Sequence, residues 1–75
     1  MLELLVLIKN YGRGISLLNE ETYHISFIKD EVEFKIELCE EDKNKYYLTL
    51  IDDPSGYILE EKYVTLREIK DIIEN

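Results

Sequence analysis

The sequence predicts a small α+β domain: an antiparallel β-meander of three to four strands, with a C-terminal amphipathic helix packed on one face. A further helix is expected at the N-terminus. The strongest evidence for the sheet is residues 31–38, which alternate strictly between charged and apolar side chains. That period is typical of a strand with one buried and one wet face. The chain has 75 residues, enough for a single domain over residues 1–75 and too few for two.

Residues 2–11 allow two interpretations. A helix would turn Leu4, Leu5, Ile8 and Tyr11 inward and stop at the glycines that follow. A strand would instead pair with residues 15–18 across a Gly12-Arg13-Gly14 turn. Leucine richness favours the helix, whereas Val6 and Ile8 favour a buried strand, and we adopt the helix.

Residues 22–28 and 31–38 form the best predicted hairpin. One apolar set contains Val32, Phe34, Ile36 and Leu38, and the other contains Tyr23, Ile25 and Phe27. Both sets share a face only if the numbers of paired residues sum to an odd value. Phe27 then pairs with Val32 around a two-residue loop, or with Phe34 around four residues. The connection lacks the glycine that two-residue hairpins prefer, so the longer loop is a serious competitor.

A second hairpin is expected after the polar connection 40–45. Residues 46–51 are rich in aromatic and β-branched side chains, and Asp53-Pro54-Ser55-Gly56 matches the residue preferences of a type I turn. Residues 57–64 would return with Tyr57, Leu59 and Tyr63 facing inward. Glu61 interrupts that face, which indicates a bulge or an exposed strand end nearby. Tyr23 and Tyr46 are also expected to face the core.

The C-terminal helix has a complete start signal. Thr65 and Glu68 have the spacing of a capping box, and Val64 and Ile69 that of a hydrophobic staple. The apolar residues that follow make one stripe at helical spacing, formed by Leu66, Ile69, Ile72 and Ile73. A helix of this length needs a partner surface, so the stripe is expected to dock on the sheet.

Charge narrows the classes of function. Nine basic residues against seventeen acidic ones give a net charge of −8, the opposite of what binding to nucleic acid or an anionic membrane requires. A basic protein partner is favoured instead. The single cysteine, Cys39, excludes an internal disulfide, and the apolar run 4–8 is shorter than a signal or membrane segment. A cytoplasmic location, in the protein's own cell or a host cell, is therefore expected.

Catalytic and metal chemistry find little support in the residues. The one histidine, His24, would point outward from its strand, and a Cys39–His24 dyad requires a shift in the alternation at Leu38. One histidine and one cysteine cannot complete a structural zinc site. Neither of the acidic clusters, Asp52-Asp53 and Glu40-Glu41-Asp42, matches a calcium loop. We therefore expect a protein that is not an enzyme and has no cofactor and no metal.

The uneven distribution of charge carries the functional hypothesis. Residues 30–42 hold seven acidic side chains against one lysine, and strand alternation places several of them on one solvent-facing surface. The predicted partner-binding residues are this acidic ridge and an outward tyrosine, namely Glu31, Glu33, Glu37, Glu40, Glu41, Asp42 and Tyr47. The ridge would meet a basic surface of a partner protein.

The most specific form of this hypothesis is an inhibitor of the phage or mobile-element type. Such a protein, for example an anti-CRISPR or another anti-defence protein, would imitate DNA and block the nucleic-acid groove of its partner. The alternative is an assembly module that homodimerises through a sheet edge or through the outward Tyr47–Ile51 stripe.

Overall fold

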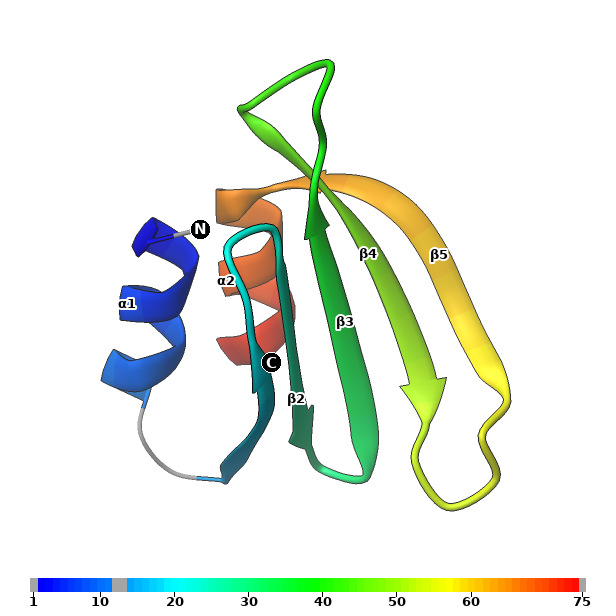
Figure 1. Ribbon diagram of the computed structural model, residues 1–75. Coiled ribbons are helices and arrows are strands. Elements are labelled where there is room, and N and C mark those ends of the chain that lie inside the picture. The colour runs from blue at the N-terminus through cyan, green and yellow to red at the C-terminus, as the bar shows by residue number, and fades with distance from the viewer. Residues whose placement is uncertain (1, 12–13, 75) are drawn as a thin grey trace.

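The described part of the chain folds into one five-stranded antiparallel sheet and two helices (Figure 1). The computed structural model describes residues 2–11 and 14–74. In chain order the elements are α1 (Leu2–Tyr11), β1 (Ile15–Glu20), β2 (His24–Lys29), β3 (Val32–Leu38), β4 (Lys45–Asp52), β5 (Ile58–Thr65) and α2 (Leu66–Glu74). The α+β class is confirmed. The predicted three to four strands are too few, because residues 15–20 also form a strand.

The strands lie side by side in the order of the sequence, and both helices cover the same face of the sheet (Figure 1). This inner face and the helices enclose the core, whereas no helix or strand of residues 2–11 and 14–74 covers the outer face. The buried core consists of Leu4, Ile8, Ile25, Phe27, Phe34, Ile36, Tyr46, Leu48, Val64, Ile69 and Ile73. Within it the rings of Phe27 and Phe34 stack with their centroids 4.8 Å apart.

The N-terminal helix is confirmed, and it buries Leu4 and Ile8. Residues 15–18 do form a strand, but β1 pairs with β2 and not with residues 2–11. The register of this pair shifts between Leu17 and Asn19, so a bulge interrupts the period of two that would have revealed the strand. The predicted turn at Gly12-Arg13 lies outside the described residues.

Lys29 is a charged residue on the inner face, at the end of β2. Its amine donates a hydrogen bond to Asp30 at 2.9 Å and lies 5.3 Å from the centre of the Tyr11 ring. The bond to the Asp30 carboxylate raises the pKa of Lys29 above its ordinary value. The lysine stem thus packs under α1 while its charged end stays paired.

The hairpin of β2 and β3 has the register in which Phe27 faces Phe34. The pairing continues to Lys29 and Val32, so the connection is a two-residue turn and not the four-residue loop expected with this register. Its residues, Asp30 and Glu31, have φ angles of 52° and 66°. Two positive φ angles are the requirement of a type I′ turn, which is met here without glycine.

We expect Glu31→Gly to raise the free energy of unfolding by about 1 kcal/mol, because a left-handed backbone costs a residue with a Cβ about that much. Urea denaturation followed by circular dichroism measures the change. Glu33→Gly is the matched control: it makes the same chemical change within β3, where glycine weakens the strand. A loss of stability in both variants would contradict a strained turn.

The second hairpin differs from its prediction in which side chains face inward. Val64, Lys62 and Glu60 pair with the inner residues of β4, so Tyr63 and Leu59 point to the other face or to solvent. The register shifts at Leu59, close to the bulge expected near Glu61. The reason is that β5 is an edge strand that curves away from the helices (Figure 1). Its inner side therefore carries the Lys62–Glu60 ion pair at 3.0 Å.

Two further details of the sequence-based prediction need correction. Tyr23, expected in the core, lies before β2 and is exposed, and Tyr57 is exposed as well; Tyr46 is buried as predicted. The turn after β4 begins one residue earlier than expected. The Asp52 carboxylate accepts hydrogen bonds from the backbone and hydroxyl of Ser55, and the Asp52 carbonyl accepts one from the Gly56 amide.

The start of α2 agrees with its prediction. The Thr65 amide donates to Glu68 Oε1 at 3.1 Å, and the Glu68 amide donates to Thr65 Oγ1 at 3.2 Å. These reciprocal bonds form the capping box, and Val64 and Ile69 of the predicted staple are both buried. The capped helix turns Ile69 and Ile73 onto the sheet.

Candidate functional site

The outer face of the sheet is the surface on which the predicted binding residues gather. One rung of paired residues crosses four strands through His24, Glu37, Tyr47 and Tyr63. Directly paired residues point to the same face, and their neighbours in sequence, such as Ile36 and Leu48, point into the core. The rung therefore presents aromatic and acidic side chains together on the uncovered face.

At one end of this face lies a shallow hollow, which we call the Tyr–Glu hollow. It has a volume of about 460 Å³ and is lined by Glu37, Leu38, Cys39, Glu40, Glu41, Tyr47 and Tyr63. Four of the seven predicted binding residues are among these. The Tyr47 and Tyr63 rings pack edge to face, with centroids 5.1 Å apart and planes at 66°. The hollow thus joins a fixed aromatic pair to three carboxylates.

The electrostatic environment of Tyr47 reflects these neighbours. Its pKa is raised above the ordinary value, first because surrounding side chains exclude water and then because of the negative charge of Glu61. Tyr63 and Glu37 act in the same direction. Tyr47 therefore stays a neutral phenol in an acidic surrounding, and its ring remains an electron-rich surface.

The other three predicted residues lie away from the Tyr–Glu hollow. Glu31 is in the turn at the opposite end of β3, and Glu33 lies 3.8 Å from the Lys35 amine. Asp42 shapes the connection between β3 and β4, where its carboxylate accepts a hydrogen bond from the Asn44 amide at 2.9 Å. The acidic ridge is consequently not continuous along β3, because Lys35 divides it.

His24 and Cys39 are placed by two different parts of the fold. His24 lies on the outer rung opposite Glu37, and its Nδ1 is 3.4 Å from Asn19 Nδ2. Cys39 is a half-buried free thiol directly after β3, and its amide bonds to the Lys45 carbonyl. Cys39 lines the Tyr–Glu hollow, whereas His24 is not among the residues lining it.

Leu38, Cys39 and Tyr63 also line the Tyr–Glu hollow but are not among the predicted binding residues. The most important of them is Tyr63, which the alternation of aromatic residues in 57–64 places in the core. The available signal was Val64, whose role in the helix staple fixes it in the core and so turns Tyr63 outward. Because successive residues of a strand point to opposite faces, Tyr63 then lies on the outer face of β5, beside Tyr47.

The Tyr–Glu hollow has the chemistry of a site for a cationic side chain. Aromatic faces attract an ammonium or guanidinium group through their electron density. Carboxylates add charge-assisted hydrogen bonds, because their oxygens accept the paired N–H contacts that a planar guanidinium donates. Glu37, Glu40 and Glu41 supply those carboxylates around the two rings.

Metal binding, membrane insertion and likeness to known proteins add no further candidate over the described residues. Over residues 2–11 and 14–74, no cluster of three or more His, Cys, Asp or Glu side chains is arranged to hold a metal ion. Neither helix in this part of the chain is long and apolar enough to cross a membrane. No family model, no curated protein and no solved structure matches the chain.

Proposed function

We propose that the protein is a non-enzymatic binding module whose outer sheet face docks on a basic surface of another protein. The observation that supports this most is the Tyr–Glu hollow, where two tyrosines and three glutamates meet. Charge steers the encounter, because a chain of net charge −8 attracts basic surfaces over several ångströms. The tyrosine pair then supplies the buried contact that such steering alone lacks.

Arginine is the residue that this hollow fits best. Tyr63 is 63% exposed and held against Tyr47 by the edge-to-face contact, so a guanidinium can stack on a ring that is already fixed. Little side-chain entropy is then lost on binding. Glu37 and Glu61 lie on the same face beside the pair, and their carboxylates suit the fork of guanidinium donors.

The finer form of the proposal concerns the partner's own function. Arginine-rich surfaces are common where proteins hold nucleic acid, so the chain would compete with DNA or RNA for such a surface. An inhibitor of the phage or mobile-element type, directed against a defence nuclease, would act in this way. The division of the acidic ridge by Lys35 favours a few anchoring contacts over imitation of a regular row of phosphates.

The test uses a peptide in which arginine alternates with glycine, titrated into the isotope-labelled protein and followed by NMR. We expect the largest amide shifts at the residues lining the Tyr–Glu hollow, and binding that weakens steeply with salt. The variant E37K/E40K/E41K reverses the three carboxylates of the hollow and should lose this binding. Its matched control, E20K/E21K/D53K, makes the same charge change at exposed positions elsewhere.

Equal binding by both variants would contradict the proposal, because only net charge would then matter. The finer form has its own test. A partner captured from lysate by the wild type and the control, but not by E37K/E40K/E41K, should be displaced by duplex DNA. A partner that binds the chain and DNA simultaneously would overturn the finer form and leave the docking face unaffected.

A further inference from the structure

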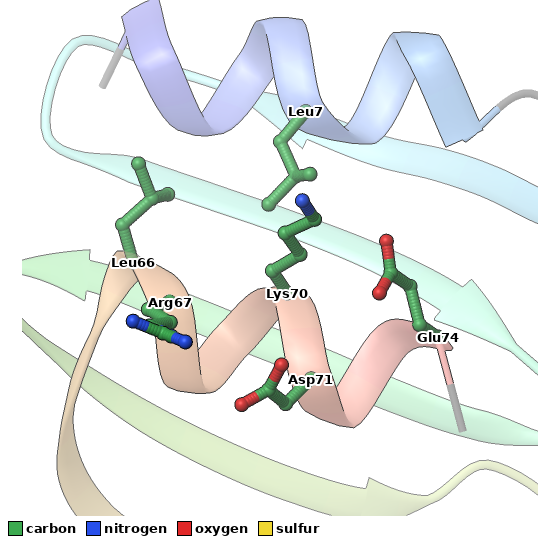
Figure 2. Close-up of a pocket in the computed structure, with 6 residues that line it drawn as sticks. All are labelled: Leu7, Leu66, Arg67, Lys70, Asp71 and Glu74. Carbon is green, nitrogen blue, oxygen red and sulfur yellow. The ribbon is translucent and has the colours of Figure 1, made fainter.

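The outward side of α2 carries a stripe of four charged residues. Their spacing of three, four and seven positions places them on one side of the helix, opposite the buried Ile69 and Ile73. With Leu7 of α1 and Leu66, the stripe lines a shallow hollow of about 550 Å³ between the two helices (Figure 2). The four residues of this α2 stripe are Arg67, Lys70, Asp71 and Glu74.

The order of signs in the α2 stripe is unusual for a free helix. Arg67 lies in the first turn and Glu74 in the last, and no basic residue occupies that last turn. The macrodipole favours the reverse arrangement, with acids at the N-terminal end and bases at the C-terminal end. Pairs four residues apart also run from cation to anion, which is the weaker orientation within a helix.

The charges of the α2 stripe are also free of partners within the described part of the chain. The ion pairs there involve Lys29, Lys35 and Lys62 with acids in β3, β5 and the hairpin turn. Figure 2 shows Lys70 extending toward Leu7, while Asp71 and Glu74 lie separately along the helix. Four charges in reach of solvent thus remain available to a second surface.

A second copy of α2 can pair with all four charges of the α2 stripe. Two positive residues are followed by two negative ones, so the pattern inverts about the midpoint between Lys70 and Asp71. When two copies lie antiparallel about a two-fold axis through that midpoint, Arg67 faces Glu74 of the second copy, and Lys70 faces its Asp71. A two-fold interface requires such a self-complementary patch. The antiparallel helix dipoles are attractive as well.

The surface around the α2 stripe also favours a second copy of the chain as its partner. Leu7 and Leu66 are half-buried between the helices, and on α1 the side chain of Val6, next to Leu7 in the sequence, is 49% exposed. A helix that is apolar on nearly every side is normally covered. The two helices together carry three basic and four acidic residues. Two copies of the chain that meet through their helices therefore repel each other little. The acidic outer sheet face would repel its own copy.

We propose that the protein forms an antiparallel homodimer through the α2 stripe and the adjoining surface of α1. In this dimer each stripe contributes its cations to the anions of the other, and the apolar side chains between the helices are covered. Both outer sheet faces remain free. The dimer is therefore independent of the docking function proposed above, and it differs from a dimer through the sheet edge or the Tyr47–Ile51 stripe.

A charge-swap experiment on the full chain tests the dimer. R67E/K70E makes the stripe wholly negative and D71K/E74K makes it wholly positive, so analytical ultracentrifugation should find each variant monomeric where the wild type is dimeric. An equimolar mixture of the two should restore a species of dimeric mass, a heterodimer. Both variants also improve the match to the macrodipole, so circular dichroism should show them folded.

Charge-matched variants outside the stripe serve as controls. K43E/K45E and E20K/E21K change the net charge by the same amounts at exposed positions, and both should dimerise as the wild type does. A wild-type protein that stays monomeric up to about 1 mM would overturn the dimer. So would a mixture of the two swapped variants that remains monomeric under conditions where the wild type dimerises.

Discussion

Replacing Phe27 by alanine should destabilise the fold by about 3–5 kcal/mol, the usual cost of removing a buried phenylalanine. Phe27 is completely buried and stacks on Phe34 across the central hairpin, so truncation removes contacts on both strands and leaves a cavity. A domain of 75 residues has about 4–11 kcal/mol in total. The variant should therefore lose a large part of the stability of the domain and unfold at a much lower concentration of urea.

Urea denaturation followed by circular dichroism measures this loss. Leu17→Ala is the matched control, because Leu17 pairs with Phe27 in the neighbouring strand and is 40% exposed. It should cost about 1 kcal/mol, in proportion to the smaller apolar area that it removes from water. If both variants lost equal stability, the core would not be centred on Phe27.

The second large effect is on binding. Tyr63→Ala should weaken binding of the arginine–glycine peptide by about tenfold or more, equal to at least about 1.4 kcal/mol. The substitution removes the exposed ring of the tyrosine pair, and Tyr47 loses the contact that fixes its orientation. Because Tyr63 is mostly exposed, the free energy of unfolding should change little.

Tyr57→Ala is the control for this measurement. Tyr57 is 75% exposed and does not line the Tyr–Glu hollow, so its removal deletes an equally accessible ring elsewhere. Isothermal titration calorimetry with the same peptide compares the three proteins. Equal losses for both variants would show that tyrosines contribute generally and that the hollow has no special role.

The elements with an unbroken period were predictable from sequence. The alternation in residues 31–38 defined β3, and the Thr65–Glu68 capping box located the start of α2 to the residue. Bulges explain why the strand β1 and the inward-facing side of β5 were not predicted correctly. The shifts at Leu18 and Leu59 break the period of two in β1 and β5, so apolar content alone suggested the wrong inner side for β5.

The candidate site was predictable in part for the same reason. Glu37 and Tyr47 follow from the well-patterned β3 and β4, and Glu40 and Glu41 from the polar connection between them; the structure brings the four together. Tyr63 depends on the register across the bulged edge strand, which composition does not reveal. The separation of Glu31 from the hollow reflects the length of β3, since charged residues close in sequence can lie at opposite ends of one strand.

The order of the strands has a consequence for how the chain folds. Every strand pairs with its neighbour in sequence, so each hairpin can form through short loops, which favours rapid folding for a sheet protein. The helices are the exception, because residues of α1 and α2 meet in the core from opposite ends of the chain. Until that long loop closes, the leucines of α1 are exposed to other molecules. Misfolding and aggregation should therefore begin at α1, and variants that slow its docking should require chaperones most.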